Sequence, residues 1–295
     1  MNKPSYADCV IDPVTRHLER HANADGGNRV IVSGDVFSDD ASVECRRFLF
    51  DLTDRDLMPN LNWLLVTKHP QNIAKMVSKP VCFGCGKSAS CSGTYEGHAG
   101  IACDECCGHG CEDGYCEKIE GVRPNLWIGT VVSTQSEADE RIPHLLKVPA
   151  KVRFVVCHPK APINLVSLGS PTRDVLHGWV AATGEYPEGA NTTRIDWVIA
   201  AGETGPNARP THPDWFRSLR DQCVNAGVPF WFDGWGEWYP FEQMKYVTGG
   251  THLVPWVNGA KSWLRDSNGS PEFAAVGKES AGRQLDGREW REVPQ

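Results

Sequence analysis

The segment IDWVIAAGETGPNARPTHPDWFRSLRDQCVNAGVPFWF, residues 195–232, decides the fold because it contains a strand, a helix and a second strand in order. It begins with an almost continuous apolar run and ends with VPFWF, residues 228–232, which is typical of strands buried on both faces of a parallel sheet. Between the two runs, Thr211 is expected to cap a helix that ends at Gly227. This strand, helix, strand unit predicts an α/β protein.

Four similar apolar runs precede this unit: RVIVS (29–33), NWLLVT (62–67), NLWIGTV (125–131) and VRFVVC (152–157). Helix-like segments separate some of them. Residues 40–57 have an apolar stripe, and residues 133–148 begin with a Ser133 or Thr134 cap and contain Pro143, which is expected to kink or break the helix. Six strands with crossovers predict a parallel sheet, either an incomplete (βα) barrel or a doubly wound sheet. The pattern alone does not choose between them.

Two further segments are expected to be irregular. Residues 167–194 are rich in Gly, Thr and Pro and are expected to run over the surface. The tail from Tyr239 onward has no clean period, and VGKESAGRQLDGREW, residues 276–290, is expected to form a loop with a short terminal helix. We expect one α/β domain, with barrel parts at 1–81 and 121–240, an insertion at 82–120 and a C-terminal extension at 241–295.

The bulk properties exclude several classes of protein. The chain has 295 residues and a formal net charge of −7, which provides no basic field for strong non-specific binding of nucleic acid. No apolar run approaches the ~18 residues of a membrane span, and the first residues do not resemble a signal peptide. We therefore expect a cytoplasmic protein without a membrane partner.

The strongest motif indicates a metal. Eight of the twelve cysteines lie between Cys82 and Cys116, and in a reducing compartment such clustering favours metal binding over disulfides. Two Cys-x2-Cys pairs separated by seventeen residues match a four-thiolate zinc ribbon, in which the closed site is structural. The predicted zinc ligands are Cys82, Cys85, Cys103 and Cys106. Four further cysteines could complete a second site: Cys91, Cys107, Cys111 and Cys116.

An iron–sulfur cluster is the alternative occupant of these cysteines. Cys107, Cys111 and Cys116 would supply three thiolates and leave one iron open. The number of thiolates does not separate zinc from iron, but the glycine-rich surroundings favour a small zinc site.

Polar residues that follow the predicted strands form the second constellation. In a parallel α/β fold the site lies at the carboxyl ends of the strands. This rule nominates Ser33, Asp35, Thr67, Lys68, Thr130, Ser133, His158, Glu203, Thr204 and Asp233. Glu203 is the best single candidate, because AAGETG places its carboxylate between two glycines that allow the backbone to approach a ligand. The candidates for catalysis are His158, Glu203, Asp233 and Lys68.

Several stretches resemble a known family: PNLWIGTVVSTQSEADERIPHLL, IDWVIAAGETGPNARPTHPDWFRSLRDQC, PFWFDGWGEW and VGKESAGRQLDGREW. They are similar to phage-encoded radical S-adenosylmethionine-type proteins, also called phage three-cysteine-motif proteins, over residues 29–295. That family resembles spore photoproduct lyase in fold. The resemblance implies a partial (βα)6 barrel and decides the choice that the pattern left open.

The chain departs from that family at its defining residues. Members carry a C-x3-C-x2-C triad near the N-terminus, which holds a [4Fe–4S] cluster that binds S-adenosylmethionine. Here that region contains Cys9 alone, and one thiolate cannot hold the cluster. The chain also has VCHP where relatives have S-A-E-P, and FDGWG where they have F-K-Q-W-G. His158 and Asp233 thus replace a Glu and a Lys, and if they face each other Asp233 could orient or charge His158.

Three functions follow as expectations. The first in rank is a non-catalytic or repurposed binding protein with structural zinc, whose insertion contacts a host or phage protein. The second is a radical enzyme acting on a nucleoside, nucleotide or DNA base, as in DNA modification, with a cluster on other cysteines. The third is a cluster-free acid–base enzyme that uses the mouth of the barrel. Zinc is the expected cofactor, and the missing triad argues against S-adenosylmethionine.

Overall fold

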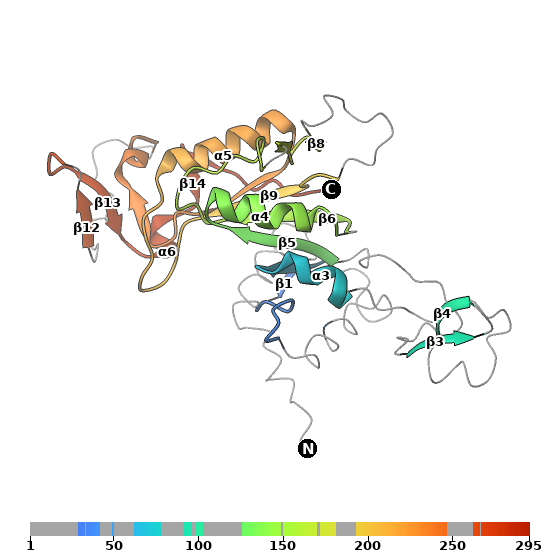
Figure 1. Cartoon of the computed structure of the whole chain (residues 1–295). Helices are drawn as coiled ribbons and strands as arrows, with labels where there is room; N and C mark the ends of the chain where they lie inside the picture. The colour runs from blue at the N-terminus through green and yellow to red at the C-terminus, as the bar shows by residue number, and fades with distance from the viewer. Residues whose placement is uncertain are drawn as a thin grey trace, which may run out of the picture.

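A six-stranded parallel sheet forms the centre of the computed structural model, in the order β1-β2-β5-β6-β9-β10 (Figure 1). The structure describes residues 29–32, 34–41, 49, 62–77, 91–95, 98–102, 126–148, 150–169, 172–180, 193–246, 262–265 and 267–295. The six strands are β1 (Arg29–Val32), β2 (Asn62–Thr67), β5 (Leu126–Val132), β6 (Val152–Cys157), β9 (Trp197–Ala201) and β10 (Phe230–Gly234). All six predicted strands are therefore confirmed to within two residues at each end.

The strand order decides the architecture. Each crossover moves one strand in the same direction, and right-handed crossovers then place every helix on one face of the sheet. A doubly wound sheet instead reverses direction at a switch point, which this order lacks. The protein is thus a mixed α/β structure with a curled, parallel half-barrel sheet, which is compatible with the partial barrel expected from the sequence.

Three helices cover the outer face of the sheet: α3 (Pro70–Val77), α4 (Gln135–Leu145) and α5 (Pro213–Ala226) (Figure 1). The Thr134 cap of α4 is confirmed, since its hydroxyl accepts a hydrogen bond from the Glu137 N–H at 3.3 Å. Pro143 does not break α4, which ends two residues later. The Thr211 cap of α5 is wrong: His212 is the N-cap, and its Nδ1 accepts from the Asp214 N–H at 3.2 Å.

The connection between β6 and β9 differs from a barrel crossover, because its described residues form no helix. It contains a short hairpin of β7 (Arg173–Asp174) and β8 (Trp179–Val180). Its apolar side chains are almost completely buried against the outer face of the sheet: Ile163, Leu165, Leu168, Val175 and Leu176. Leu168, Val175 and Leu176 fall within the segment expected at the surface, so that expectation is wrong for this part of residues 167–194. The connection fills the place that a helix occupies elsewhere.

The cysteine-rich segment follows α3 and so adds to the crossover between β2 and β5 rather than replacing it. Its described part is an antiparallel hairpin of β3 (Cys91–Tyr95) and β4 (His98–Ala102), drawn apart from the sheet in Figure 1. The other cysteines of this segment lie outside the described residues, and Cys91 is described only as the first backbone position of β3.

The C-terminal region forms more structure than the sequence indicated. It contains β11 (Trp238–Pro240), the 3-10 helix η1 (Phe241–Tyr246), β12 (Ser262–Arg265), β13 (Pro271–Ala275), α6 (Lys278–Ala281), β14 (Gln284–Leu285) and β15 (Arg288–Glu289). Strands β11, β13 and β12 pair in an antiparallel sheet, and β14 and β15 form a hairpin. Residues 290–292 then run antiparallel to β10, with the Phe232 N–H donating to the Trp290 carbonyl at 2.9 Å. No helix among the described residues is long and apolar enough to span a membrane.

An aromatic layer fills the inner face of the half-barrel. Trp127 and Trp231 both meet Trp197 edge to face, with ring centroids 6.1 Å apart in each pair. The Trp197 indole N–H donates to the Glu292 carbonyl at 2.9 Å, so the C-terminal segment also fixes this layer. Among the described tryptophans, Trp63, Trp127, Trp197 and Trp235 are buried in the protein interior.

Gly129 makes room for this layer. A Cβ placed at Gly129 would lie 2.4 Å from a ring carbon of Phe154. We expect Gly129→Ala to lower the free energy of unfolding by about 1–3 kcal/mol, because the Phe154 ring must move in a close-packed interior. Urea unfolding measures the effect. In a Phe154→Leu background the same substitution should cost clearly less, and an equal cost in both backgrounds would show that the Phe154 contact is not the cause.

Candidate functional site

A polar cavity of about 80 Å³ lies at the carboxyl ends of three neighbouring strands, β6, β9 and β10. This is the position at which a parallel α/β sheet presents its site. The lining residues come from the three strand ends and from α6: His158, Ala201, Gly202, Thr204, Asp233, Gly234, Gly236 and Lys278. The structure therefore brings together three of the polar residues that the sequence nominated, His158, Thr204 and Asp233.

Two glycines fix the backbone around the cavity. A Cβ at Gly202 would lie 1.9 Å from the Trp235 carbonyl oxygen, and a Cβ at Gly236 would lie 2.1 Å from the Glu203 carbonyl oxygen. Gly236 also has a φ of 76°, a left-handed conformation that favours glycine. The loops after β9 and β10 can therefore touch backbone to backbone, and the Glu237 N–H donates to the Glu203 carbonyl at 2.9 Å.

His158 enters the cavity directly after β6. Its Nδ1 lies 3.1 Å from the Ala201 carbonyl oxygen, which can only accept, so Nδ1 carries the proton. Burial lowers the pKa of His158 below its ordinary value, although the neighbouring carbonyls and the carboxylates of Glu203 and Asp233 oppose the shift. The ring is therefore neutral at neutral pH, with Nε2 as an unprotonated acceptor.

Asp233 is held by Lys278 and not by His158. The Lys278 Nζ donates to Asp233 Oδ2 at 3.1 Å across the cavity, from α6 to β10. His158 and Asp233 therefore do not form the direct contact that the sequence suggested. Both line the same cavity, and the negative charge of Asp233 raises the pKa of His158 through space. Nothing in the sequence pattern pointed to Lys278.

Glu203 is tied to a second, shallower cavity beside the first. Arg209 donates to both Glu203 carboxylate oxygens, at 2.6 and 3.2 Å, and this pairing lowers the pKa of Glu203. The second cavity has a volume of about 70 Å³, and its lining also includes Lys160 and Trp215. Because Glu203 is ionised and already paired, it is not placed to act as a general acid at neutral pH.

The remaining nominated residues have structural contacts. The Asp35 carboxylate accepts from the Lys68 backbone N–H at 2.8 Å, and Thr130 donates to the Thr67 carbonyl at 2.8 Å. The Lys68 side chain is exposed and lines neither cavity. Of the remaining two, Ser133 donates its N–H to Glu137, and Ser33 lies outside the described residues.

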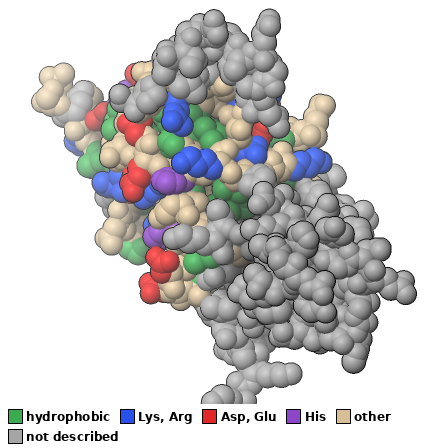
Figure 2. Space-filling model, turned by 45° about the vertical axis from the view of Figure 1, so that its right-hand side comes forward, with side chains coloured by type: hydrophobic (Ala, Val, Ile, Leu, Met, Phe, Trp, Pro, Cys, Tyr) green, Lys and Arg blue, Asp and Glu red, His purple; other side chains and the backbone are tan. Residues whose placement is uncertain are grey.

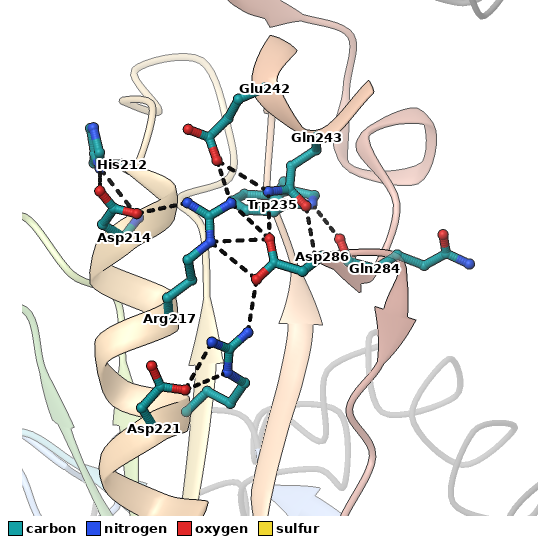
Figure 3. A network of polar contacts seen from close by, with 10 residues as sticks. His212, Asp214, Arg217, Asp221, Trp235, Glu242, Gln243, Gln284 and Asp286 are labelled. Atoms are coloured by element: carbon teal, nitrogen blue, oxygen red, sulfur yellow. Dashed lines mark hydrogen bonds and ion pairs between the residues drawn. The ribbon is translucent and has the colours of Figure 1, made fainter. Parts of the chain in front are cut away.

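An ion network around Asp286 holds the segment that carries Lys278 (Figure 3). Arg217 donates to Asp286 at 2.7 Å, and Arg220 donates to its other oxygen at 2.8 Å. Gln243 donates to the carboxylate at 3.1 Å and accepts from the Asp286 N–H at 2.8 Å. The β14–β15 hairpin is thereby fixed to α5 and η1, and the Trp235 indole N–H adds a bond to the Gln284 carbonyl at 2.9 Å.

The backbone of the hairpin explains why Asp286 occupies this position. Asp286 has a φ of 55° and Gly287 a φ of 77°, the two left-handed residues of a tight type I′ turn. The dipeptide Asp-Gly is a strong sequence signal for such a turn. The hairpin was therefore predictable from its sequence, whereas the partners of the carboxylate were not.

The comparisons with known proteins add one finding. A family model described as "Protein of unknown function (DUF5131)" matches residues 9–294. The chain belongs to this family. No curated protein and no solved structure matches the chain. The DUF5131 match includes all six strands of the sheet, the cysteine-rich segment and the Asp286 network.

The Asp286 network makes a pH-dependent contribution to stability. Burial alone would raise the pKa of Asp286, but hydrogen bonds from Arg217, Gln243 and Arg220 hold it well below its ordinary value. The network therefore stabilises the folded state above the unfolded pKa of about 3.9, and this contribution is lost as the pH falls through the lower folded pKa.

We expect Asp286→Asn to lower the free energy of unfolding by about 1–3 kcal/mol at pH 7, since it removes charged hydrogen bonds from a half-buried site. Asparagine tolerates the left-handed backbone, so the turn itself is kept. Urea unfolding between pH 7 and pH 2 should show the deficit shrinking below about pH 4. The control is Asp221→Asn, at the exposed partner of Arg220, which should lower the free energy of unfolding by about 0.5 kcal/mol or less. A deficit that stays constant in acid would contradict the role of the charge.

Proposed function

We propose that this chain is a binding protein that recognises a small polar group at the carboxyl ends of β6, β9 and β10. The observation that carries the proposal is the state of the cavity's charged groups. Asp233 and Lys278 neutralise each other, Glu203 is paired with Arg209, and His158 is anchored to a carbonyl. Such groups are preorganised to hold a ligand, because little reorganisation is needed on binding.

The same proposal includes the family from which the half-barrel derives. The half-barrel is that of a radical S-adenosylmethionine-type phage protein that has lost its cluster triad and works in the host cytosol. Against retention of the lost cofactor stands the aromatic layer, which occupies the inner face of the sheet. The mouth cavity is also far below the ~300 Å³ of a typical ligand pocket.

A radical enzyme acting on a nucleoside, nucleotide or DNA base is the alternative that would need cluster ligands from the cysteines outside the described residues. For nucleic acid itself, support is slight. The net charge is −7, and Lys and Arg side chains are interspersed with Asp and Glu on the face shown in Figure 2. A host or phage protein that contacts the insertion remains the proposed macromolecular partner.

A cluster-free acid–base enzyme is favoured by one specific observation. Neutral His158 with an unprotonated Nε2 in a cavity meets the basic requirement for a general base. Against it, neither nearby carboxylate is placed to provide the complementary acid: the pKa of Glu203 is lowered, and Asp233 is paired with Lys278. We rank this function below binding.

The binding function and the acid–base function predict different results with a low-molecular-weight extract of host cells. Immobilised protein is incubated with the extract, and mass spectrometry measures retained and converted compounds. We expect the wild type to retain a compound that His158→Leu does not, because leucine removes the ring nitrogens from the cavity. Lys147→Gln, at an exposed position after α4, should retain it as the wild type does. Conversion of a compound by the wild type alone would instead establish an enzyme, and no retained compound would remove the binding proposal.

We also propose that the cysteine-rich segment holds structural zinc. Anaerobically purified protein should contain about one or two zinc ions per chain, given four thiolates per site, no iron and no visible colour. Cys82→Ser should lower the zinc content, while Cys9→Ser, outside the cluster, should not. A coloured, iron-containing protein would contradict the zinc proposal and favour the radical enzyme.

A further inference from the structure

The lining of the mouth cavity has no net formal charge at neutral pH. Its only ionised side chains are Asp233 and Lys278, which form one ion pair, and its histidine is neutral. Thr204 and the remaining residues carry no charge. A ligand group that enters such a cavity loses water without gaining a net counter-charge, so a charged group is disfavoured. The occupant is therefore expected to be neutral.

Hydrogen-bonding groups of both kinds line this small space. His158 Nε2 is an acceptor, because Nδ1 carries the proton and faces the Ala201 carbonyl oxygen. The Asp233 carboxylate accepts, with Oδ2 already bonded to Lys278, while the Lys278 ammonium has three N–H groups and uses one on Asp233. The side chains of His158 and Asp233 thus offer acceptors and that of Lys278 offers donors, while the Thr204 hydroxyl can do either.

The volume limits the size of the group. About 80 Å³ is far below the ~300 Å³ at the lower end of drug-sized ligand pockets. Only a small head group fits this space, and the rest of a larger ligand would extend past the exposed Thr204 and Lys278.

We propose that the cavity binds the primary carboxamide group of a neutral ligand. Its NH2 would donate to His158 Nε2 and to Asp233, and its carbonyl would accept from Lys278. A carboxylate would face the unprotonated Nε2 and a second carboxylate, and an ammonium or guanidinium group would face the Lys278 ammonium. This assignment rests on the proposed binding function and names the class of group that the site selects.

The imidazole nitrogens of His158 report occupancy directly. Full-length protein labelled with 15N-histidine is titrated at pH 7.5 with acetamide, and in parallel with acetate and ethylene glycol as probes of other classes. We expect acetamide to move the His158 Nε2 resonance in a saturable way, while those of His144 and His212, which line neither cavity, stay in place. These resonances also show that each variant is folded.

Two variants test the contact of acetamide with Lys278, and the pH dependence of binding tests its contact with His158. Lys278→Gln should weaken acetamide binding about tenfold or more through loss of a charged donor, whereas Lys160→Gln, in the neighbouring cavity, should not change it. Acetamide binding should also weaken as His158 becomes protonated, because the proton occupies Nε2. The charged groups that face this ring are Asp233, Glu203 and Lys278, and all three are kept in the Lys160 control.

The outcomes separate the two proposals. A response to acetate or ethylene glycol without one to acetamide overturns the carboxamide assignment and leaves a binding site in place. No response to any probe, together with a compound retained from the cell extract, also overturns only the assignment. No response and no retained compound remove the binding function as well.

Discussion

Asp286 accepts hydrogen bonds from Arg217, Arg220 and Gln243, and these contacts join the C-terminal hairpin to helix α5. The hairpin is continuous with α6 on one side and with the strand at 290–292 on the other. One carboxylate thus holds a segment that supplies Lys278 to the cavity and also pairs with β10. The completed site depends on this contact, because the six-stranded sheet supplies the cavity's floor and not its cationic wall.

The sheet itself was largely predictable from the sequence. Strands buried on both faces must be apolar at nearly every position, so the six strands can be recognised in the sequence as six apolar segments. The positions of side chains at the strand ends followed as well, so His158, Thr204 and Asp233 were found. Lys278 was not, because it lies on a four-residue helix whose place is set by contacts far away in the chain.

Other differences have local physical causes. The N-cap of α5 moved by one residue because the His212 ring nitrogen can accept a hydrogen bond as a hydroxyl does. Residues 167–194 were expected at the surface because they are rich in Gly, Thr and Pro. Five buried apolar side chains are enough to fill the space of a helix, and a periodic pattern is not needed for that. Glu203 pairs with Arg209 and Asp233 pairs with Lys278 because these long side chains can reach them in the folded protein, and the spacing of residues in the sequence does not show this.

The strand at 290–292 has a consequence for the order in which the protein matures. Residues 278–292 are synthesised after all six strands of the sheet, so the growing chain presents β10 with an unpaired outer edge until they arrive. An unpaired edge is a template for association with other chains. Synthesis that stops before Lys278 therefore yields a polypeptide that has all six strands of the sheet but an unpaired β10 edge, which can associate with other chains. Residues 278–292 therefore have two roles: they pair with the edge of β10, and they supply Lys278 to the cavity.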